Sequence, residues 1–178
     1  LRGIFPATVS TFGPDGVFDP TMMRRMVRHQ VNAGVQGLYV CGGTGEGLLM
    51  TMNERQQAIE TVLDEVNGRV TVIAHIGAFQ IPETIALAKH ASDAGADAIA
   101  ALPPSYFFKP DEIAQVEYYT SIANVSEVPV LIYNSVRIIS HAFYPRGGVS
   151  GFWCLRTIFE VILVSCSTLK QQKSDRKS

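Results

Sequence analysis

One feature of the sequence constrains the fold more than any other: short apolar runs alternate with amphipathic segments about every 30 residues, as far as Asn134. The apolar runs are continuous, which is typical of parallel strands that are covered on both faces of a sheet. We expect strands in residues 3–11, 37–41, 70–76, 98–102 and 128–133. This βαβαβαβαβ order predicts an α/β fold, either an open parallel sheet or a barrel.

Helix start and stop signals fall between the expected strands. Asp19 followed by Pro20 is typical of an N-cap and a first helical position, and Gly34 of a helix end. Residues 51–54 have the pattern of a capping box. We expect four helices, which begin near residues 20, 51, 82 and 110. Right-handed crossovers would place every loop that follows a strand at the same edge of the sheet, where the chemistry is then expected.

The alternation stops at Ser135, and the composition changes at the same position. Residues 1–134 contain 8 Lys+Arg and 14 Asp+Glu (net −6), whereas residues 135–178 contain 7 and 2 (net +5). We therefore expect two units, a parallel α/β unit in residues 1–134 and a tail of undetermined structure in residues 135–178. The apolar run 158–164 within the tail fits either an edge strand or a helix.

Composition excludes several classes of protein. A hydrophobic content of 47% with 17% charged residues is typical of a globular chain, and a net charge of −1 gives no reason to expect nucleic-acid binding. The three cysteines lack metal-ligand or paired spacing, so we expect a reducing, cytoplasmic location and no metal. The apolar run 152–164 contains Arg156 and Glu160 and is short for a membrane span, so no membrane association is expected.

The glycine-rich segment Gly42-Gly43-Thr44-Gly45-Glu46 follows an expected strand. Glycines allow backbone amides to converge on an anion, and the Thr44 hydroxyl adds a further donor. No Gly-Lys-Ser/Thr follows, so the segment is not a P-loop, and its glycine spacing differs from that of a dinucleotide fingerprint. It predicts a site for a carboxylate or a phosphate, although an ordinary tight turn would also explain the glycines.

Aromatic side chains occupy two further positions at this edge. Tyr133 ends an expected strand, where its hydroxyl could relay a proton or the ring could simply close the barrel. The stiff loop 103–110 carries Tyr106 and Phe107, which could line a pocket or cover the core. His75 ends another expected strand, and we interpret it as a hydrogen-bonded structural residue.

Together these motifs resemble the N-acetylneuraminate lyase / dihydrodipicolinate synthase family. The resemblance covers residues 1–134, about three quarters of the chain, and its specificity lies in the ordered combination of motifs. The matching segments are Leu1-Arg2-Gly3-Ile4, Gly37-Leu38-Tyr39-Val40-Cys41-Gly42-Gly43-Thr44-Gly45-Glu46, Glu54-Arg55, Ile73-Ala74-His75-Ile76-Gly77, residues 103–110 and Ile132-Tyr133-Asn134.

The resemblance implies a (β/α)8 TIM barrel that acts as a class I aldolase through a Schiff base between a lysine and pyruvate. It implies that Gly43, Thr44 and Gly45 bind the pyruvate carboxylate, that Tyr133 and Thr44 are catalytic through proton transfer, and that no cofactor is needed. Its substrates would be pyruvate and a sugar or aldehyde, and full-length relatives would be homo-oligomers. Gly47 and the amino-acid sequences of the second and third expected strands favour the branch that cleaves a sialic acid to pyruvate and N-acetylmannosamine. The alternative is the 4-hydroxy-tetrahydrodipicolinate synthase branch.

The sequence departs from the family pattern at three places. Gly43 replaces a usual Ser or Thr, and Phe107 replaces the second tyrosine of the synthase branch. After Asn134 the family's Gly-x-Lys-x-Ser/Thr strand, with its Schiff-base lysine, has no counterpart. We therefore expect a TIM barrel truncated after about five strands, with an unrelated C-terminal tail, two open sheet edges and weak folding or self-association. A third hypothesis is a non-catalytic product with only a binding or interaction role.

Overall fold

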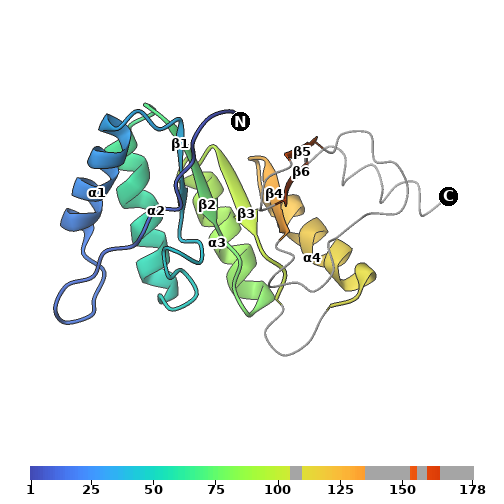
Figure 1. Cartoon of the computed structure of the whole chain (residues 1–178). Coiled ribbons are helices and arrows are strands. Elements are labelled where there is room, and N and C mark those ends of the chain that lie inside the picture. Colours follow the sequence, from blue (N-terminus) through green and yellow to red (C-terminus); the bar gives the residue numbers. More distant parts are fainter. Residues whose placement is uncertain (105–109, 135–152, 156–159, 165–178) are drawn as a thin grey trace.

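Figure 1 shows the computed structural model of the chain, which describes residues 1–104, 110–134, 153–155 and 160–164. The central strands are β1 (Gly37–Val40), β2 (Thr71–His75), β3 (Ala98–Ala101) and β4 (Val130–Asn134). The helices are α1 (Pro20–Asn32), α2 (Met52–Val66), α3 (Ile81–Asp93) and α4 (Glu112–Val125). Each strand pairs in parallel with the next one along the chain, which confirms the predicted α/β alternation.

The helix ends follow the local signals in the sequence. The Asp19 side chain accepts hydrogen bonds from the first two amides after Pro20 and so caps α1. In α2 the Thr51 hydroxyl accepts from the Glu54 amide, while the Glu54 carboxylate accepts from the Thr51 amide, which confirms the capping box. Asn67 ends the helix in the left-handed conformation, with a φ of 45°.

The prediction of a strand in residues 3–11 was wrong. Only Ala7 forms a bridge there, in parallel with Tyr39 of β1, so the described sheet has four parallel strands and not five. The amide of Ile4 donates instead to the Gln36 side chain, and Pro6 has no amide to donate. The segment therefore follows β1 through a few backbone hydrogen bonds, among them those that join Tyr39 to Pro6 and Thr8, without forming a full strand.

Part of the region after Ser135 extends the sheet. β6 (Glu160–Val164) pairs antiparallel with β4, and β5 (Trp153–Leu155) pairs antiparallel with β6. The strand order is β1-β2-β3-β4-β6-β5. Of the two alternatives for the apolar run 158–164, the structure confirms a strand, over residues 160–164, which pairs with the free hydrogen-bonding edge of β4.

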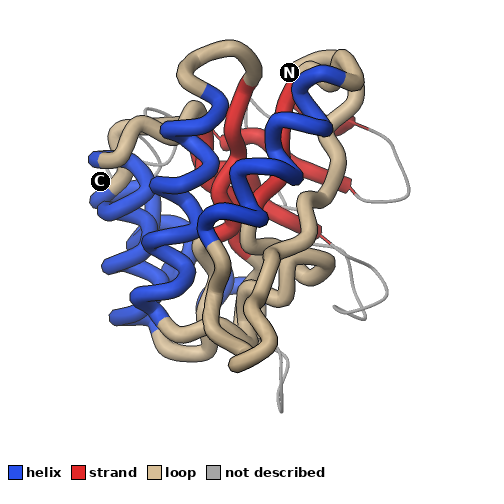
Figure 2. Tube along the Cα trace, turned by 90° about the vertical axis from the view of Figure 1, so that its left-hand side faces the viewer, coloured by secondary structure: helices blue, strands red, loops and turns tan. Residues whose placement is uncertain are grey.

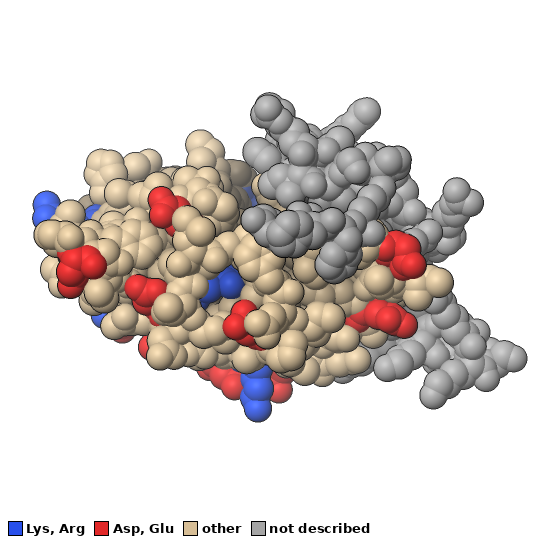
Figure 3. Space-filling model, turned by 90° about the horizontal axis from the view of Figure 1, so that it is seen from below, with Lys and Arg blue, Asp and Glu red and all other residues tan. Residues whose placement is uncertain are grey.

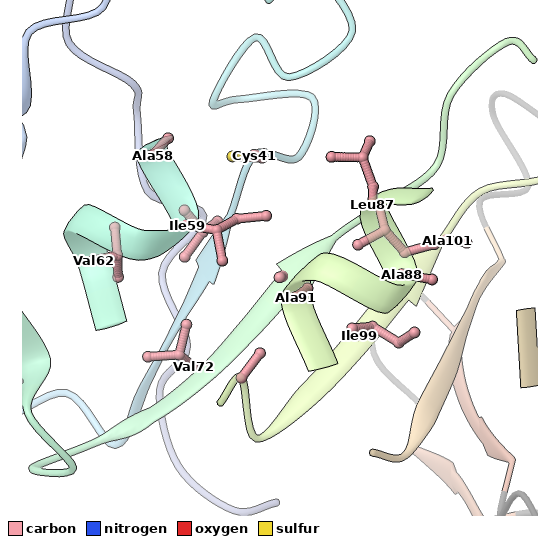
Figure 4. Packing of buried hydrophobic residues seen from close by; sticks show 14 of the residues in the cluster. Cys41, Ala58, Ile59, Val62, Val72, Leu87, Ala88, Ala91, Ile99 and Ala101 are labelled. Atoms are coloured by element: carbon pink, nitrogen blue, oxygen red, sulfur yellow. The ribbon is translucent and has the colours of Figure 1, made fainter. Parts of the chain in front are cut away.

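The main hydrophobic core lies between the helices and one face of the sheet. Figure 2 shows the helices gathered on one side of the strands, and α1 packs mainly against α2. In Figure 4, Ile59 of α2 and Leu87 of α3 lie over Val72 and Ile99 of the sheet. All four are buried, and their branched side chains pack the helices closely against the strands.

The opposite face of the sheet carries a second set of buried residues, which we call the inner-face cluster. It contains Ile73, Ala98, Ala100 and Leu131, against which Phe5 and Tyr39 pack. Successive residues of a strand alternate between the two faces, so Tyr39 points away from the helix side, where Leu38 and Val40 are buried. In a closed barrel this second face is the interior.

In the part of the chain that the structure describes, no helix combines the length and the hydropathy that a membrane crossing would require.

Candidate active site

The carboxyl ends of the four parallel strands lie on the lower side of Figure 1, and Figure 3 views the molecule from that side. Among the described residues in that view, charged side chains are scattered singly among uncharged ones and form no continuous patch. The loops that follow β1 and β2, and the last residues of β4, meet at this end of the sheet. In parallel α/β proteins the reactive groups are found at this end.

The loop after β1 is compact and depends on its glycines. The Glu46 amide donates to the Gly43 carbonyl at 3.1 Å, and the Gly47 amide donates to the Gly42 carbonyl at 3.1 Å. A Cβ built on Gly47 would lie 1.9 Å from the Cys41 carbonyl oxygen, so no larger residue fits at that position. The chain therefore closes tightly on itself and fixes the loop tip between these contacts.

The tip of this loop presents free donors. Gly43 and Thr44 are exposed, whereas Gly45 is buried. Within the described part of the chain, the amides of Thr44 and Gly45 donate to no protein acceptor, and the Thr44 hydroxyl makes no hydrogen bond. Such a set of donors suits an anion, and the assignment of Gly43, Thr44 and Gly45 as a carboxylate site stays a prediction.

Tyr133 is half-buried at the end of β4 and lies against Tyr39. The two ring centroids are 6.0 Å apart with an interplanar angle of 36°. Burial raises the pKa of Tyr133 above its ordinary value, so the phenol carries its proton near neutral pH. Its predicted role in proton transfer is compatible with this protonation state and awaits a test.

His75, at the end of the neighbouring strand β2, also lies near Tyr39, with ring centroids 6.2 Å apart. Burial, and then the nearby Arg55 cation, lower the pKa of His75 to about 3, so the imidazole is neutral. Its Nδ1 atom is buried and has no hydrogen-bond partner. A hydrogen bond with the Cys41 backbone partly opposes the lowering of the His75 pKa, which agrees with the expected hydrogen-bonded structural histidine.

Arg55 is a residue that sequence reasoning treated only as part of a helix motif. It is 2% exposed, and its guanidinium donates from Nη2 to the His75 carbonyl at 2.7 Å and from Nη1 to the Gly77 carbonyl at 2.9 Å. These two bonds attach the first turn of α2 to the end of β2. The signal that could have found it is its place one residue after the capping-box glutamate, beside a buried helix face.

The structure brings Tyr133 and His75 together through Tyr39, which sequence reasoning did not select. The signal for Tyr39 was its aromatic hydroxyl between two aliphatic residues of a strand, on the face opposite to theirs. No described contact joins Thr44 to Tyr133, and the predicted pocket residues Tyr106 and Phe107 lie outside the described residues. Among the residues that the structure does describe, no three His, Cys, Asp or Glu side chains gather as metal ligands.

A separate cavity of about 510 Å³ lies at the opposite end of the sheet. It is lined by the last turn of α2, the end of α3 and residues just before β2, with Asp64, Asn67 and Asp97 among its polar groups. The amino ends of the strands in this type of fold serve stability more than chemistry. The site at the carboxyl ends is therefore the better candidate.

Residues 1–139 match the model of the family described as "Dihydrodipicolinate synthetase family". A 4-hydroxy-tetrahydrodipicolinate synthase of Methanothermobacter thermautotrophicus is 37% identical over 134 residues, 75% of this chain and 47% of that protein. An N-acetylneuraminate lyase of Rhizobium meliloti is 35% identical over 136 residues, 75% of this chain and 44% of that protein. The chain thus spans slightly less than half the length of these relatives.

A solved structure gives the same result for the fold. The structure of a Ruminococcus gnavus sialic acid aldolase, described as a catalytic lysine mutant, superposes with a TM-score of 0.77 at 32% identity. The match covers 80% of this chain and 47% of that one. The resemblance first noted in the sequence motifs therefore extends to the arrangement of the strands and helices.

Proposed function

This chain belongs to the dihydrodipicolinate synthetase family, and on that premise we propose that its residues 1–134 form the keto-acid-binding part of a pyruvate-dependent aldolase or lyase. The observation that carries the proposal is the pairing of unpartnered loop donors with a phenol at the same end of the sheet. A carboxylate needs such donors, and carbon–carbon bond chemistry next to a carbonyl needs a proton carrier.

In this proposal the amides of Thr44 and Gly45, with the Thr44 hydroxyl, hold the carboxylate of pyruvate. Tyr133 then faces the reacting carbons with its hydroxyl protonated, because burial raises its pKa. The phenol gives its proton to the oxygen formed on carbon–carbon bond formation and removes it again in the cleavage direction. These residues bind, orient and move one proton, and they do not themselves activate the carbonyl.

Carbonyl activation in a class I aldolase requires a lysine amine, which forms an imine with pyruvate and releases water. The sequence has five lysines, and none lies in a Gly-x-Lys-x-Ser/Thr strand. Lys89 is exposed on α3, and the others lie outside the described residues: Lys109, Lys170, Lys173 and Lys177. We therefore propose that this chain binds the keto acid without converting it.

We propose the sialic acid branch for the cognate reaction, with pyruvate and N-acetylmannosamine as cleavage products. Gly47 supports it, since the Gly-Glu-Gly sequence of the loop favours that branch. The close packing of Gly47 against Cys41 leaves no room for a side chain at this position. The synthase-like condensation of pyruvate with an aldehyde is the second candidate, because a synthase relative is equally similar. Residues 135–178 are proposed as a separate, non-family segment.

The test is borohydride reduction of the purified chain in the presence of pyruvate, followed by intact-mass measurement. An aldolase with its lysine is trapped as a stable adduct, and the wild-type Ruminococcus gnavus enzyme is a suitable positive control. We expect no adduct on this chain. A stable adduct mapped to any of its lysines would overturn the non-catalytic assignment.

A further inference from the structure

The Tyr39 hydroxyl is a buried polar group without a partner. Its oxygen is buried and makes no hydrogen bond in the structure. Buried tyrosine hydroxyls normally find a partner, because an unpartnered one forfeits its bonds to water. The exception lies in the middle of β1, on the inner face and directly beside Tyr133.

The backbone of Tyr39 is held by hydrogen bonds at both its amide and its carbonyl. Its amide donates to the Pro6 carbonyl at 3.0 Å, and its carbonyl accepts from the Thr8 amide at 2.9 Å. Two strands separate β1 from β4, yet the rings of Tyr39 and Tyr133 approach to 6.0 Å. The strand next to β4 presents only Ala98 and Ala100 to this face, and these small side chains leave room for the two rings to meet.

From this geometry, and on the basis of the function proposed above, we propose that Tyr39 is a positioning residue for Tyr133. Its ring holds the Tyr133 ring at the carboxyl end of β4. Its hydroxyl donates, through one water molecule or an oxygen of the bound keto acid, toward the hydroxyl of Tyr133. An unpartnered donor beside the proton carrier is thus explained by a bond that a water molecule completes in the free protein and the keto acid completes in the complex.

The charges around Tyr39 keep it a donor. The titratable groups around it are Tyr133 on β4, His75 on β2, Arg55 on α2 and Tyr119 on α4. Burial raises the pKa of Tyr39 far above its ordinary value; Tyr133 raises it further and Arg55 opposes the shift less strongly. The neighbouring groups are phenols, an imidazole and a guanidinium, so no anion competes for the Tyr39 hydroxyl proton.

The experiment replaces one hydroxyl at a time in chains labelled with 3-fluorotyrosine. ¹⁹F NMR follows each tyrosine separately, and the signal lost in Tyr133→Phe identifies Tyr133. In Tyr39→Phe we expect the Tyr133 pKa to rise by about half a unit or more, because its phenolate loses a hydrogen-bond donor. The control is Tyr118→Phe, which removes a hydroxyl bonded to the Leu102 carbonyl and should leave the Tyr133 pKa unchanged.

Thermal unfolding separates this role from a structural one. Removing an unpartnered hydroxyl should leave the melting temperature of Tyr39→Phe unchanged or higher, whereas Tyr118→Phe should melt lower because it loses a hydrogen bond. An unchanged Tyr133 pKa in a folded Tyr39→Phe variant would overturn the proposal.

If Tyr39→Phe does not fold, the test is a ring-to-ring nuclear Overhauser effect between Tyr39 and Tyr133, measured in the unsubstituted protein. The absence of this effect would overturn the inference. Pyruvate added to the labelled protein tests the function independently. A raised Tyr133 pKa in Tyr39→Phe, together with no response of Tyr133 to pyruvate, would support the positioning role and refute the keto-acid site.

Discussion

Replacing Arg55 with methionine should destabilise the chain by about 2–4 kcal/mol. The variant removes two charge-assisted hydrogen bonds, of 2.7 Å to His75 and 2.9 Å to Gly77, and each such bond contributes about 1.5–3 kcal/mol. The gross loss of about 3–6 kcal/mol is partly offset, because the variant no longer buries a cation. Methionine retains most of the apolar stem, so the effect reports on the two carbonyls and not on a cavity.

The assay is urea unfolding followed by far-ultraviolet circular dichroism, with the midpoint and slope compared between variants. The matched control is Arg24→Met, which breaks an exposed ion pair with Asp64 and should cost at most about 1 kcal/mol. Arg55→Lys should fall between the two, since one ammonium group lacks the planar fork that reaches both carbonyls. A loss for Arg55→Met no larger than that for Arg24→Met would refute the reasoning.

Three further predictions concern the core, the loop and pH. Ile59→Ala, which truncates a buried side chain of α2, should lower the unfolding free energy by about 2–5 kcal/mol in the same assay. Gly43→Ser should leave the melting temperature unchanged, because nothing lies within 4 Å of its Cβ, and the added hydroxyl should strengthen pyruvate binding; Gly47→Ser, which meets a carbonyl at 1.9 Å, should fold poorly. His75 has a pKa depressed from 6.5 to about 3, so the unfolded state binds its proton first. Stability should therefore fall as pH drops from 6.5 toward 3, by up to about 1.4 kcal/mol per pH unit from this group, and His75→Gln should show a shallower fall.

The sequence predicted the elements whose signals are local. Caps such as Asp19 and Thr51 act within one helical turn, and continuous apolar runs define buried parallel strands, so four helices and four strands were correctly located. The strand predicted around Ala7 was wrong. Its apolar pattern does not show that the Ile4 amide donates to the Gln36 side chain, or that Pro6 leaves the ladder without a donor.

The candidate site was harder to predict from the sequence than the fold. Gly43, Thr44 and Tyr133 could be selected because they follow strands, and their roles stay predictions. Tyr39 and Arg55 carry only weak local signals, because their significance lies in long-range contacts: a ring that crosses the inner face, and a guanidinium that bonds to carbonyls 20 and 22 residues along the chain. Spacing along the sequence carries no information on such contacts.

The proposed function requires a keto acid to bind between the loop after β1 and Tyr133. The most direct test is a titration of the ¹⁵N-labelled chain with pyruvate, followed by amide chemical shifts. We predict saturable shifts concentrated at Thr44 and Gly45 and at the end of β4, which are lost in Thr44→Ala and absent when acetamide replaces pyruvate. No saturable shift, or shifts confined to the cavity near Asp64 and Asp97, would contradict the assignment.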